Sequence, residues 1–420
     1  MEMQTKIDRI SDLPWDILDT ILLCLPVRDA VRTSILSRKW RYKWTGISQF
    51  VFDDKCISSS LSDKVARWGE IIKIMNQVQS NHSGPIEKFK LAAYCRPNYS
   101  DLDQWIYFLT TKGIKEFSLQ DFDFCKRYKL PSCLLSSPHL SHLKLYGCVF
   151  ELPPSFKGFY HLTCLELIQV SINGDTLENL IINCPVLERL TLLKIDPLTC
   201  LKIHNQNLKH LRINSEFEDI YLGNSPLLAT VDICLISEKR RGSTPRFLTK
   251  RRACDLVRNF NNLSGIKRLT LSGLFLEFLA MHSEPKRPPI VLAHLVALHL
   301  KEVRFDCLKE VVVSLTILGS SPNLEELFIS VGHSDYATQR VEFLKVDWLS
   351  EYYFKRLSVV RMIGFLETQA VHEFIKFVLA RSPILERMTT VNYTYPNILK
   401  SLLQQVEPAS ALVKIETFTL

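Results

Sequence analysis

His139 and His142 are the side chains whose type and spacing come nearest to a metal-binding pair. Imidazole nitrogens are common metal ligands, but a zinc site needs three or four protein ligands in all, from His, Cys, Asp or Glu. These two histidines lead into an apolar run, with no acidic or cysteine ligand at helical spacing. We therefore expect histidines that are solvated or lie at the edge of the core, and we predict no metal site.

Motifs for nucleophilic, phosphate and metal-assisted catalysis are missing as well. The sequence contains no G-x-x-x-x-G-K-[ST], G-x-G-x-x-G, H-E-x-x-H or G-x-S-x-G. With 14 glycines in 420 residues, loops that bring the backbone close to a phosphate are scarce. We predict a non-enzymatic protein with no catalytic residue and no cofactor.

Twelve cysteines are present, and none has C-x-x-C or zinc-finger spacing. The N-terminus is polar up to Ile10, so no signal peptide is visible, and we expect reduced thiols in the cytoplasm and/or nucleus. Four of them lie in or beside apolar runs and are expected to be buried small hydrophobes: Cys148, Cys164, Cys184 and Cys234. No apolar run approaches the ~18 residues of a membrane span, so no membrane partner is expected.

The positive charge is concentrated in one segment. Of a net charge of +8, a surplus of six lies between Glu238 and Arg258, which hold eight basic and two acidic residues. The clusters Lys239–Arg241 and Lys250–Arg252 predict an exposed loop. Such a loop is either simply solvated or a nuclear-import patch. The rest of the chain is nearly neutral, which argues against a nucleic-acid partner along its whole length.

The elements that any site must be built on begin with a small helical segment, Asp8 to Trp44. Ser11 or Asp12 is a suitable N-cap for a helix that starts at Pro14 and stops before Pro26. A second helix is expected near Arg28, and further turns near Trp40. About 40 residues rarely bury enough surface for stability, so these apolar residues need an outside surface. The alternative is a helical cap on the chain's own next domain.

This segment resembles the F-box family through three linked motifs. They are Leu13-Pro14, Leu25-Pro26-Val27-Arg28-Asp29-Ala30-Val31, and Ser34-Ile35-Leu36-Ser37-Arg38-Lys39-Trp40. The resemblance implies docking on a Skp-type adaptor and, through it, a cullin ligase. The residues predicted to bind the adaptor are Leu13, Pro14, Ile17, Leu18, Ile21, Leu22, Pro26, Val27, Leu36 and Trp40.

After Trp44 the pattern apolar-x-x-apolar-x-apolar recurs at spacings of 20 to 38 residues, once the first unit, Ile47-Phe50-Phe52, is set aside. Self-similarity at such periods indicates a solenoid, in which each unit gives one short strand. Later units include Phe354-Leu357-Val359 and Ile415-Phe418-Leu420, and the inner residues should form one core from Phe50 to Phe418. Helices are expected between strands at 64–78, 175–183, 310–318 and 368–380, several of them ending in Ser-Pro or Cys-Pro.

The repeats resemble the irregular leucine-rich repeats of F-box proteins, and Tyr353 to Val391 resembles the plant FBD motif, here read as a capping unit. The predicted fold class is therefore α/β. A small helical F-box (8–46) is followed by an irregular leucine-rich-repeat solenoid, a curved parallel sheet with helices (47–345), which is closed by an FBD-type cap (346–420). An ordinary α/β domain with leucine-rich buried strands is the alternative.

Recognition should then lie on the open face of the sheet, where the residue between the last two apolar positions of each strand points. The main candidates for contacting a substrate are Lys144, Glu166, Arg212, Asp232, His299 and Phe328. Their mixed charge and the lack of an aromatic ladder favour an unknown protein substrate over nucleic acid. We predict the substrate-recognition subunit of a Skp–cullin–F-box ubiquitin ligase. A non-ligase F-box scaffold or nuclear regulatory protein, and more weakly a nucleic-acid binder acting through the basic segment, are the alternatives.

Overall fold

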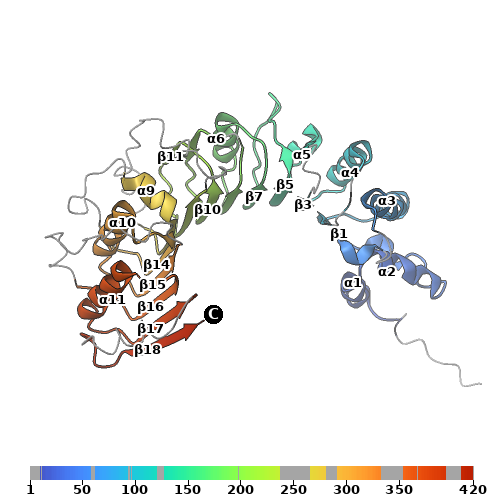
Figure 1. The fold of residues 1–420 in the computed structure, drawn as a ribbon. Helices are drawn as coiled ribbons and strands as arrows, with labels where there is room; N and C mark the ends of the chain where they lie inside the picture. The colour runs from blue at the N-terminus through green and yellow to red at the C-terminus, as the bar shows by residue number, and fades with distance from the viewer. Residues whose placement is uncertain are drawn as a thin grey trace, which may run out of the picture. The chain divides into compact units, whose positions relative to one another are not determined.

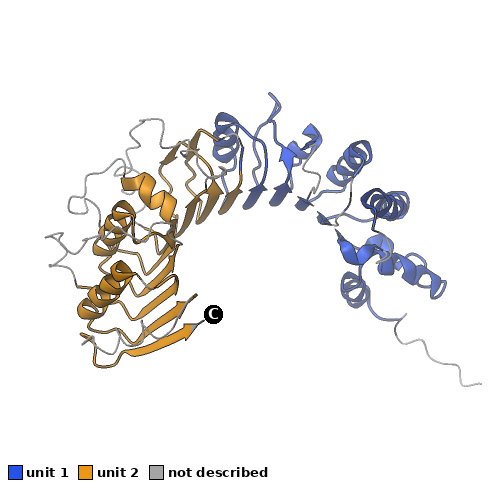
Figure 2. Cartoon of the chain, in the orientation of Figure 1, with its two compact units in different colours: residues 1–187, 195–197 blue, residues 188–194, 198–420 orange. Residues whose placement is uncertain are grey.

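The computed structural model describes residues 10, 12–57, 62–92, 95, 97–120, 127–196, 198–236, 265–280, 291–332, 353–366, 368–393 and 408–419. The predicted loop at 239–252 and the predicted boundary at 345 lie outside these residues. The chain divides into two compact units, residues 1–187 with 195–197 and residues 188–194 with 198–420 (Figure 2). Each unit has its own hydrophobic core and its own set of parallel strands.

Unit 1 begins with short helices and continues as a parallel sheet in the order β1-β2-β3-β5-β7 (Figure 1). Its helices are α1 (Trp15–Leu23), α2 (Val27–Arg32), η1 (Thr33–Ile35), η2 (Lys43–Gly46), η3 (Asp54–Cys56), α3 (Lys64–Asn81), α4 (Tyr99–Thr111), α5 (Ser132–Leu135) and α6 (Gly174–Ile182). Its strands are β1 (Gln49–Phe52), β2 (Lys88–Leu91), β3 (Glu116–Gln120), β4 (Tyr128–Lys129), β5 (His142–Tyr146), β6 (Cys148–Val149) and β7 (Cys164–Ile168).

Unit 2 continues the same construction with strands in the order β8-β10-β12-β13-β14-β15-β16-β17-β18. They are β8 (Arg189–Leu193), β10 (His210–Ser215), β12 (Thr230–Leu235), β13 (Arg268–Ser272), β14 (Ala297–Val303), β15 (Glu326–Val331), β16 (Val359–Gly364), β17 (Arg387–Asn392) and β18 (Lys414–Thr419). The helices α9 (Gly273–Ala280), α10 (Leu308–Gly319) and α11 (Gln369–Arg381) lie along one side of these strands (Figure 1). A side pair of strands, β9 (Cys200–Ile203) and β11 (Asp219–Leu222), replaces helices earlier in the unit.

The apolar triplets are confirmed as the strands of these sheets. The inner leucines of neighbouring strands are paired in register, for example Leu190 with Leu211 and Leu269 with Leu298, and each is at most 1% exposed. In the first three strands of unit 1 the same inner position holds an aromatic ring, with Phe89 and Phe117 stacked 5.6 Å apart beside Trp105. Each strand therefore adds one layer to a continuous apolar core within its unit.

Serine before proline has a definite role where a long helix returns to a strand. Ser321 Oγ donates a hydrogen bond to the carbonyl of Ile317, and Ser382 Oγ donates one to Val378, each over 2.7 Å. Carbonyls in the last turn of a helix lose their usual intrahelical partner, although that of Ile317 also accepts the N–H of Ser320 over 3.2 Å. The serine satisfies a buried acceptor, and the following proline prevents the helix from continuing.

The predicted register is wrong in the C-terminal segment. Leu327 of β15 pairs with Val360, so the true unit is Leu357-Val360-Met362, and Arg361, not Ser358, lies on the open face. The predicted core also fails at its last member, because Phe418 is 52% exposed. Met388 pairs with Ile415, which places the side chain of Phe418 on the opposite side of β18.

Two further corrections concern helices and thiols. The helices α4 and α9 were not predicted, although those at 64–78, 175–183, 310–318 and 368–380 are confirmed. Cys164 and Cys234 lie at outward strand positions and are partly exposed, whereas Cys148 and Cys184 are buried as predicted. No helix within the described ranges has the length and apolar character needed to cross a membrane.

Candidate functional site

The ten residues predicted to bind an adaptor separate into two groups. Leu18, Leu22, Val27 and Trp40 are at most 7% exposed and belong to the chain's own core, so they stabilise the helical module rather than offer surface. Six remain exposed or half-buried and can meet a partner: Leu13, Pro14, Ile17, Ile21, Pro26 and Leu36. The split follows from the 3.6-residue helical period, which places Leu18 and Leu22 on one face of α1 and Ile17 and Ile21 on another.

The start of α1 differs from the prediction. Pro14 takes the N-cap position without a side-chain hydrogen bond. The carboxylate of Asp12 is instead paired with Lys39 Nζ at 2.7 Å, which ties the beginning of the module to its end. Ser11 lies outside the described residues. The pair is more than half exposed, so its contribution to stability is at most about 1 kcal/mol.

An exposed apolar surface remains on this module. Ile17 and Ile21 are 48% and 38% exposed, and beyond α2 Ile35 and Leu36 are 85% and 66% exposed. Trp15, also exposed, has its ring over Gly46, where an added Cβ would lie 2.6 Å from ring carbon Cζ2. The predicted site did not include Trp15 or Ile35, although Ile35 lies within the third quoted motif and Trp15 directly follows the first. Large exposed apolar side chains gathered on one small module indicate a protein partner.

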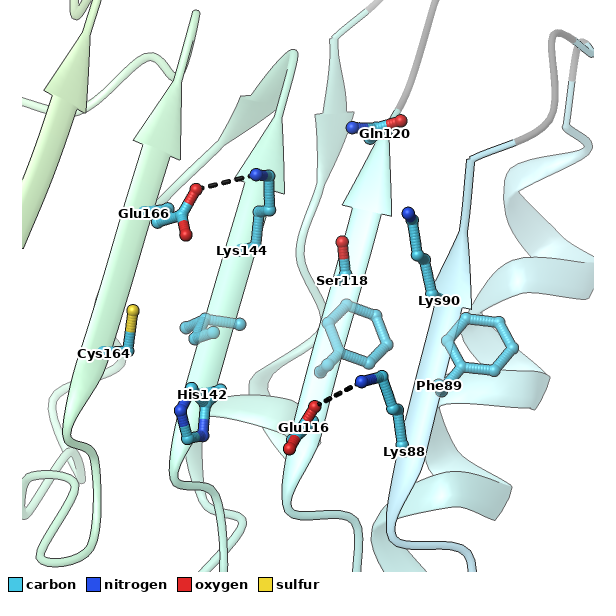
Figure 3. Close-up of a pocket in the computed structure, with 12 residues that line it drawn as sticks. Lys88, Phe89, Lys90, Glu116, Ser118, Gln120, His142, Lys144, Cys164 and Glu166 are labelled. Atoms are coloured by element: carbon cyan, nitrogen blue, oxygen red, sulfur yellow. Dashed lines mark ion pairs between the residues drawn. The ribbon is translucent and has the colours of Figure 1, made fainter. Parts of the chain in front are cut away.

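The open face of the unit 1 sheet forms a shallow hollow of about 220 Å³ across β2, β3, β5 and β7 (Figure 3). Lys144 Nζ is paired with Glu166 at 2.7 Å, and Lys88 Nζ with Glu116 at 2.9 Å, each across neighbouring strands. Both predicted residues of this unit, Lys144 and Glu166, therefore lie together in the hollow. Of the three lysines that line the hollow, two are neutralised by these pairs, and Lys90 has no ion pair among the described residues.

On the unit 2 sheet, Asp232 lies between two cations. Arg212 Nε and Lys301 Nζ lie 3.6 and 3.2 Å from its Oδ2, and Lys301 also reaches Cys234 Sγ at 3.8 Å. Burial, followed by the negative charge of Asp232, raises the pKa of Cys234 to about 12. The thiol is therefore protonated near neutral pH and is not an activated nucleophile.

Two other predicted residues, His299 and Phe328, form an aromatic pair on β14 and β15. Their rings lie 5.5 Å apart at 54°, at directly paired strand positions. Burial, together with the charge of nearby Lys301, lowers the pKa of His299 from its ordinary value. The imidazole is thus neutral near pH 7 and adds a flat, weakly polar surface beside the phenyl ring.

One cluster in unit 2 has the residue types of a metal site. Ligand atoms of Glu277, Cys307 and Glu310 lie within 4.8 Å of one another. However, the guanidinium of Arg304 bonds both carboxylates, with Nη2 2.7 Å from Glu277 and Nε 2.7 Å from Glu310. Glu310 is fully buried and also accepts the backbone N–H of Arg304. The arginine already supplies the positive charge, so this cluster stabilises the bend after β14 rather than favouring a cation.

Comparisons with known proteins agree with these features. A family model for the F-box domain matches residues 10–50, and one for the LRR domain of the At1g61320/AtMIF1 type matches residues 78–407. The chain is 35% identical over 394 residues to F-box/FBD/LRR-repeat protein At1g13570 of Arabidopsis thaliana, covering 91% of this chain and 90% of that protein. F-box/FBD/LRR-repeat protein At1g51370 of the same plant is 27% identical, covering 92% and 90%. The assignment of the C-terminal segment as an FBD-type cap stays a prediction.

Proposed function

This chain belongs to the F-box/LRR-repeat protein family, and we propose on that premise that it is the substrate-recognition subunit of a Skp–cullin–F-box ubiquitin ligase. The observation that carries the proposal is the exposed apolar surface of Ile17, Ile21 and Leu36 on a module whose core is already filled by Leu18, Leu22, Val27 and Trp40. Fully burying one such side chain is worth about 1.5–3 kcal/mol, so a few of them suffice for specific docking.

The two parts of the chain have separate roles in this proposal. The F-box module binds the Skp-type adaptor, and the open faces of the repeat sheets bind a protein substrate. The chain supplies no reacting group. A conjugating enzyme loaded with ubiquitin performs the transfer, and the receptor only brings the substrate near it. The outward strand residues Lys144, Glu166, Arg212, Asp232, His299 and Phe328 lie where such a substrate would bind.

The proposal is tested by replacing Leu13 and Pro14 together with alanine. We expect adaptor binding to weaken at least about tenfold, which corresponds to about 1.4 kcal/mol. The control is Ile182→Ala on α6, which removes an exposed apolar side chain (53%) outside the module and should leave binding unchanged. If the double variant captures the adaptor as well as the wild type does, the proposed docking is wrong.

The main alternative is an F-box protein that acts as a scaffold or nuclear regulator without a ligase. Co-purification of a cullin together with the adaptor separates the two roles, because a scaffold would capture the adaptor alone or neither protein. The basic segment 239–252 lies outside the described residues. Its part in nuclear import is tested by neutralising both clusters and following localisation between cytoplasm and nucleus.

A further inference from the structure

The open face of the unit 2 sheet differs from that of unit 1 in how its charges are matched. Four arginines at outward strand positions are exposed and have no ion pair among the described residues: Arg189, Arg268, Arg361 and Arg387. The acidic residues at paired outward positions are Asp232, already held between Arg212 and Lys301, and Glu326 and Glu416. Positive charge on this face is therefore left uncompensated.

Three of these arginines surround the aromatic pair. Arg361 of β16 is paired in register with Phe328, whose ring contacts that of His299. Arg387 lies one strand further and two residues back, opposite Val359, and Arg268 lies opposite Ala297, two residues back from His299. With strands about 4.8 Å apart, these side chains form one patch. We call it the arginine–aromatic patch: Arg268, His299, Phe328, Arg361 and Arg387.

We propose that the arginine–aromatic patch binds an acidic segment of the substrate protein, in which an apolar or aromatic residue is flanked by Asp or Glu. The apolar residue packs on Phe328 and His299, and the flanking carboxylates accept paired N–H bonds from the guanidinium groups of Arg361, Arg387 and Arg268. This inference rests on the proposed role as a substrate receptor and specifies the chemistry of what is received.

The residue types support this assignment. A guanidinium offers two parallel donors that match a carboxylate, and such charge-assisted bonds are stronger than neutral ones. Arginine and aromatic residues are also the types that carry most of the binding energy at protein interfaces. Because Arg268, Arg361 and Arg387 have no ion pair among the described residues, they do not have to break one before they bind a ligand. The lysines of the unit 1 hollow at positions 88 and 144 would have to do so.

Nucleic acid fits this face less well. Glu326 lies in the same row of the sheet as Arg268 and Arg387, between them, and would repel a phosphate chain laid across the patch. A single aromatic pair also provides no platform for successive bases. A protein segment avoids this repulsion, because it can place a hydrogen-bond donor or an apolar group opposite Glu326.

The experiment measures binding of a fluorescent peptide to the purified full-length chain. The probe peptide has a central phenylalanine flanked by Asp and Glu, and its comparison peptide has Asn and Gln at the same places. We expect the acidic peptide to bind and Arg361→Gln/Arg387→Gln to weaken it at least about tenfold. Lys88→Gln/Lys144→Gln removes the same charge from unit 1 and should have little effect. Arg361→Lys/Arg387→Lys, which keeps the charge, should recover part of the binding.

Three outcomes would overturn the inference: equal binding of the acidic and amide peptides, wild-type affinity in the double glutamine variant, or no binding of the acidic peptide at millimolar concentration. A single-stranded oligonucleotide that binds more tightly than the peptide, and is lost in the same variant, would identify a nucleic-acid surface instead. Adaptor capture is measured on the same preparations. Loss of adaptor binding with peptide binding intact contradicts only the proposed ligase role, and the reverse result contradicts only the peptide site.

Discussion

The ring nitrogen Nε2 of His82 lies 2.8 Å from the carbonyl oxygen of Ile47, and this bond joins the end of the first repeat helix to the segment that leaves the F-box. The carbonyl can only accept, so Nε2 carries the proton and donates it. The ring is 6% exposed, and its Nδ1 has no hydrogen-bond partner in the described part of the chain. Burial lowers the pKa of His82 below its ordinary value of 6.5, and the charge of Lys112 lowers it further.

Stability should therefore fall in mild acid. Because the folded-state pKa of His82 lies below the unfolded value, the unfolded chain takes up the proton first as pH falls. The contribution of neutral His82 to the free energy of unfolding is fully present above about pH 6.5 and is lost as the pH falls through the folded-state pKa. The melting temperature should therefore fall between about pH 8 and pH 5, and His82→Gln should reduce the slope of melting temperature against pH. The exposed His142→Gln should keep the wild-type slope. An unchanged slope in His82→Gln would assign the acid sensitivity to another group.

Truncating neighbouring residues of α1 should affect different properties, adaptor affinity in one case and stability in the other. Ile17→Ala/Ile21→Ala removes exposed surface, so adaptor affinity should fall at least about tenfold with little change in melting temperature. Leu18 is fully buried, so Leu18→Ala should lower the free energy of unfolding by about 2–5 kcal/mol. Calorimetry of both variants with and without adaptor separates the effects. If Ile17→Ala/Ile21→Ala binds normally, the adaptor contacts another face.

Truncation of Leu298 should destabilise only the repeats next to it. Its side chain is fully buried between the paired strands β13 and β15, so Leu298→Ala should lower the free energy of unfolding by about 2–5 kcal/mol. Since each repeat contacts only its neighbours, Leu298→Ala should raise hydrogen exchange in β13, β14 and β15 while the F-box still binds its adaptor. Thr270→Ala, at a partly exposed outward position of β13, is the control. Uniform loss of protection along the whole chain would show a single cooperative domain.

Two glycine-to-alanine substitutions should change the stability in opposite directions. Gly364 in β16 has φ +124°, and a Cβ there would lie 2.3 Å from the carbonyl oxygen of Val331. Gly364→Ala should therefore destabilise the C-terminal repeats by about 1–3 kcal/mol. Gly69 lies inside α3 with no atom within 4 Å of an added Cβ, so Gly69→Ala should stabilise by about 0.5–1 kcal/mol. Denaturant unfolding measures both, and equal effects would contradict the close backbone contact at Gly364.

The sequence predicted strands well because each apolar triplet is both local and periodic. It misplaced the register at Phe354-Leu357-Val359 because Leu357-Val360-Met362 has the same pattern three residues later, and only pairing with Leu327 selects between them. The helix α4 was missed although Leu102, Trp105, Ile106 and Leu109 have helical spacing and are buried. This helix is therefore predictable from its sequence alone.

The binding surfaces were less predictable than the strands. Burial of Leu18 beside exposed Ile17 depends on which face of α1 meets the chain's own core, and no single-sequence pattern gives that face. The ion pair of Asp232 with Lys301 joins residues 69 positions apart in sequence and requires the strand order between them. Outward positions were predictable from alternation, whereas the partners of those side chains were not.

The bonds at the F-box exit have a consequence for how a substrate would be presented. Besides the His82–Ile47 bond, the N–H of Ser83 donates to Thr45 and the N–H of Glu87 donates to Ser48, so no free linker separates the F-box from the first repeats. The local concentration of a ligand bound on the unit 1 sheet is then fixed by geometry rather than by the statistics of a flexible tether. Inserting a glycine-serine stretch after Gly46 would convert that fixed presentation into a distribution of distances.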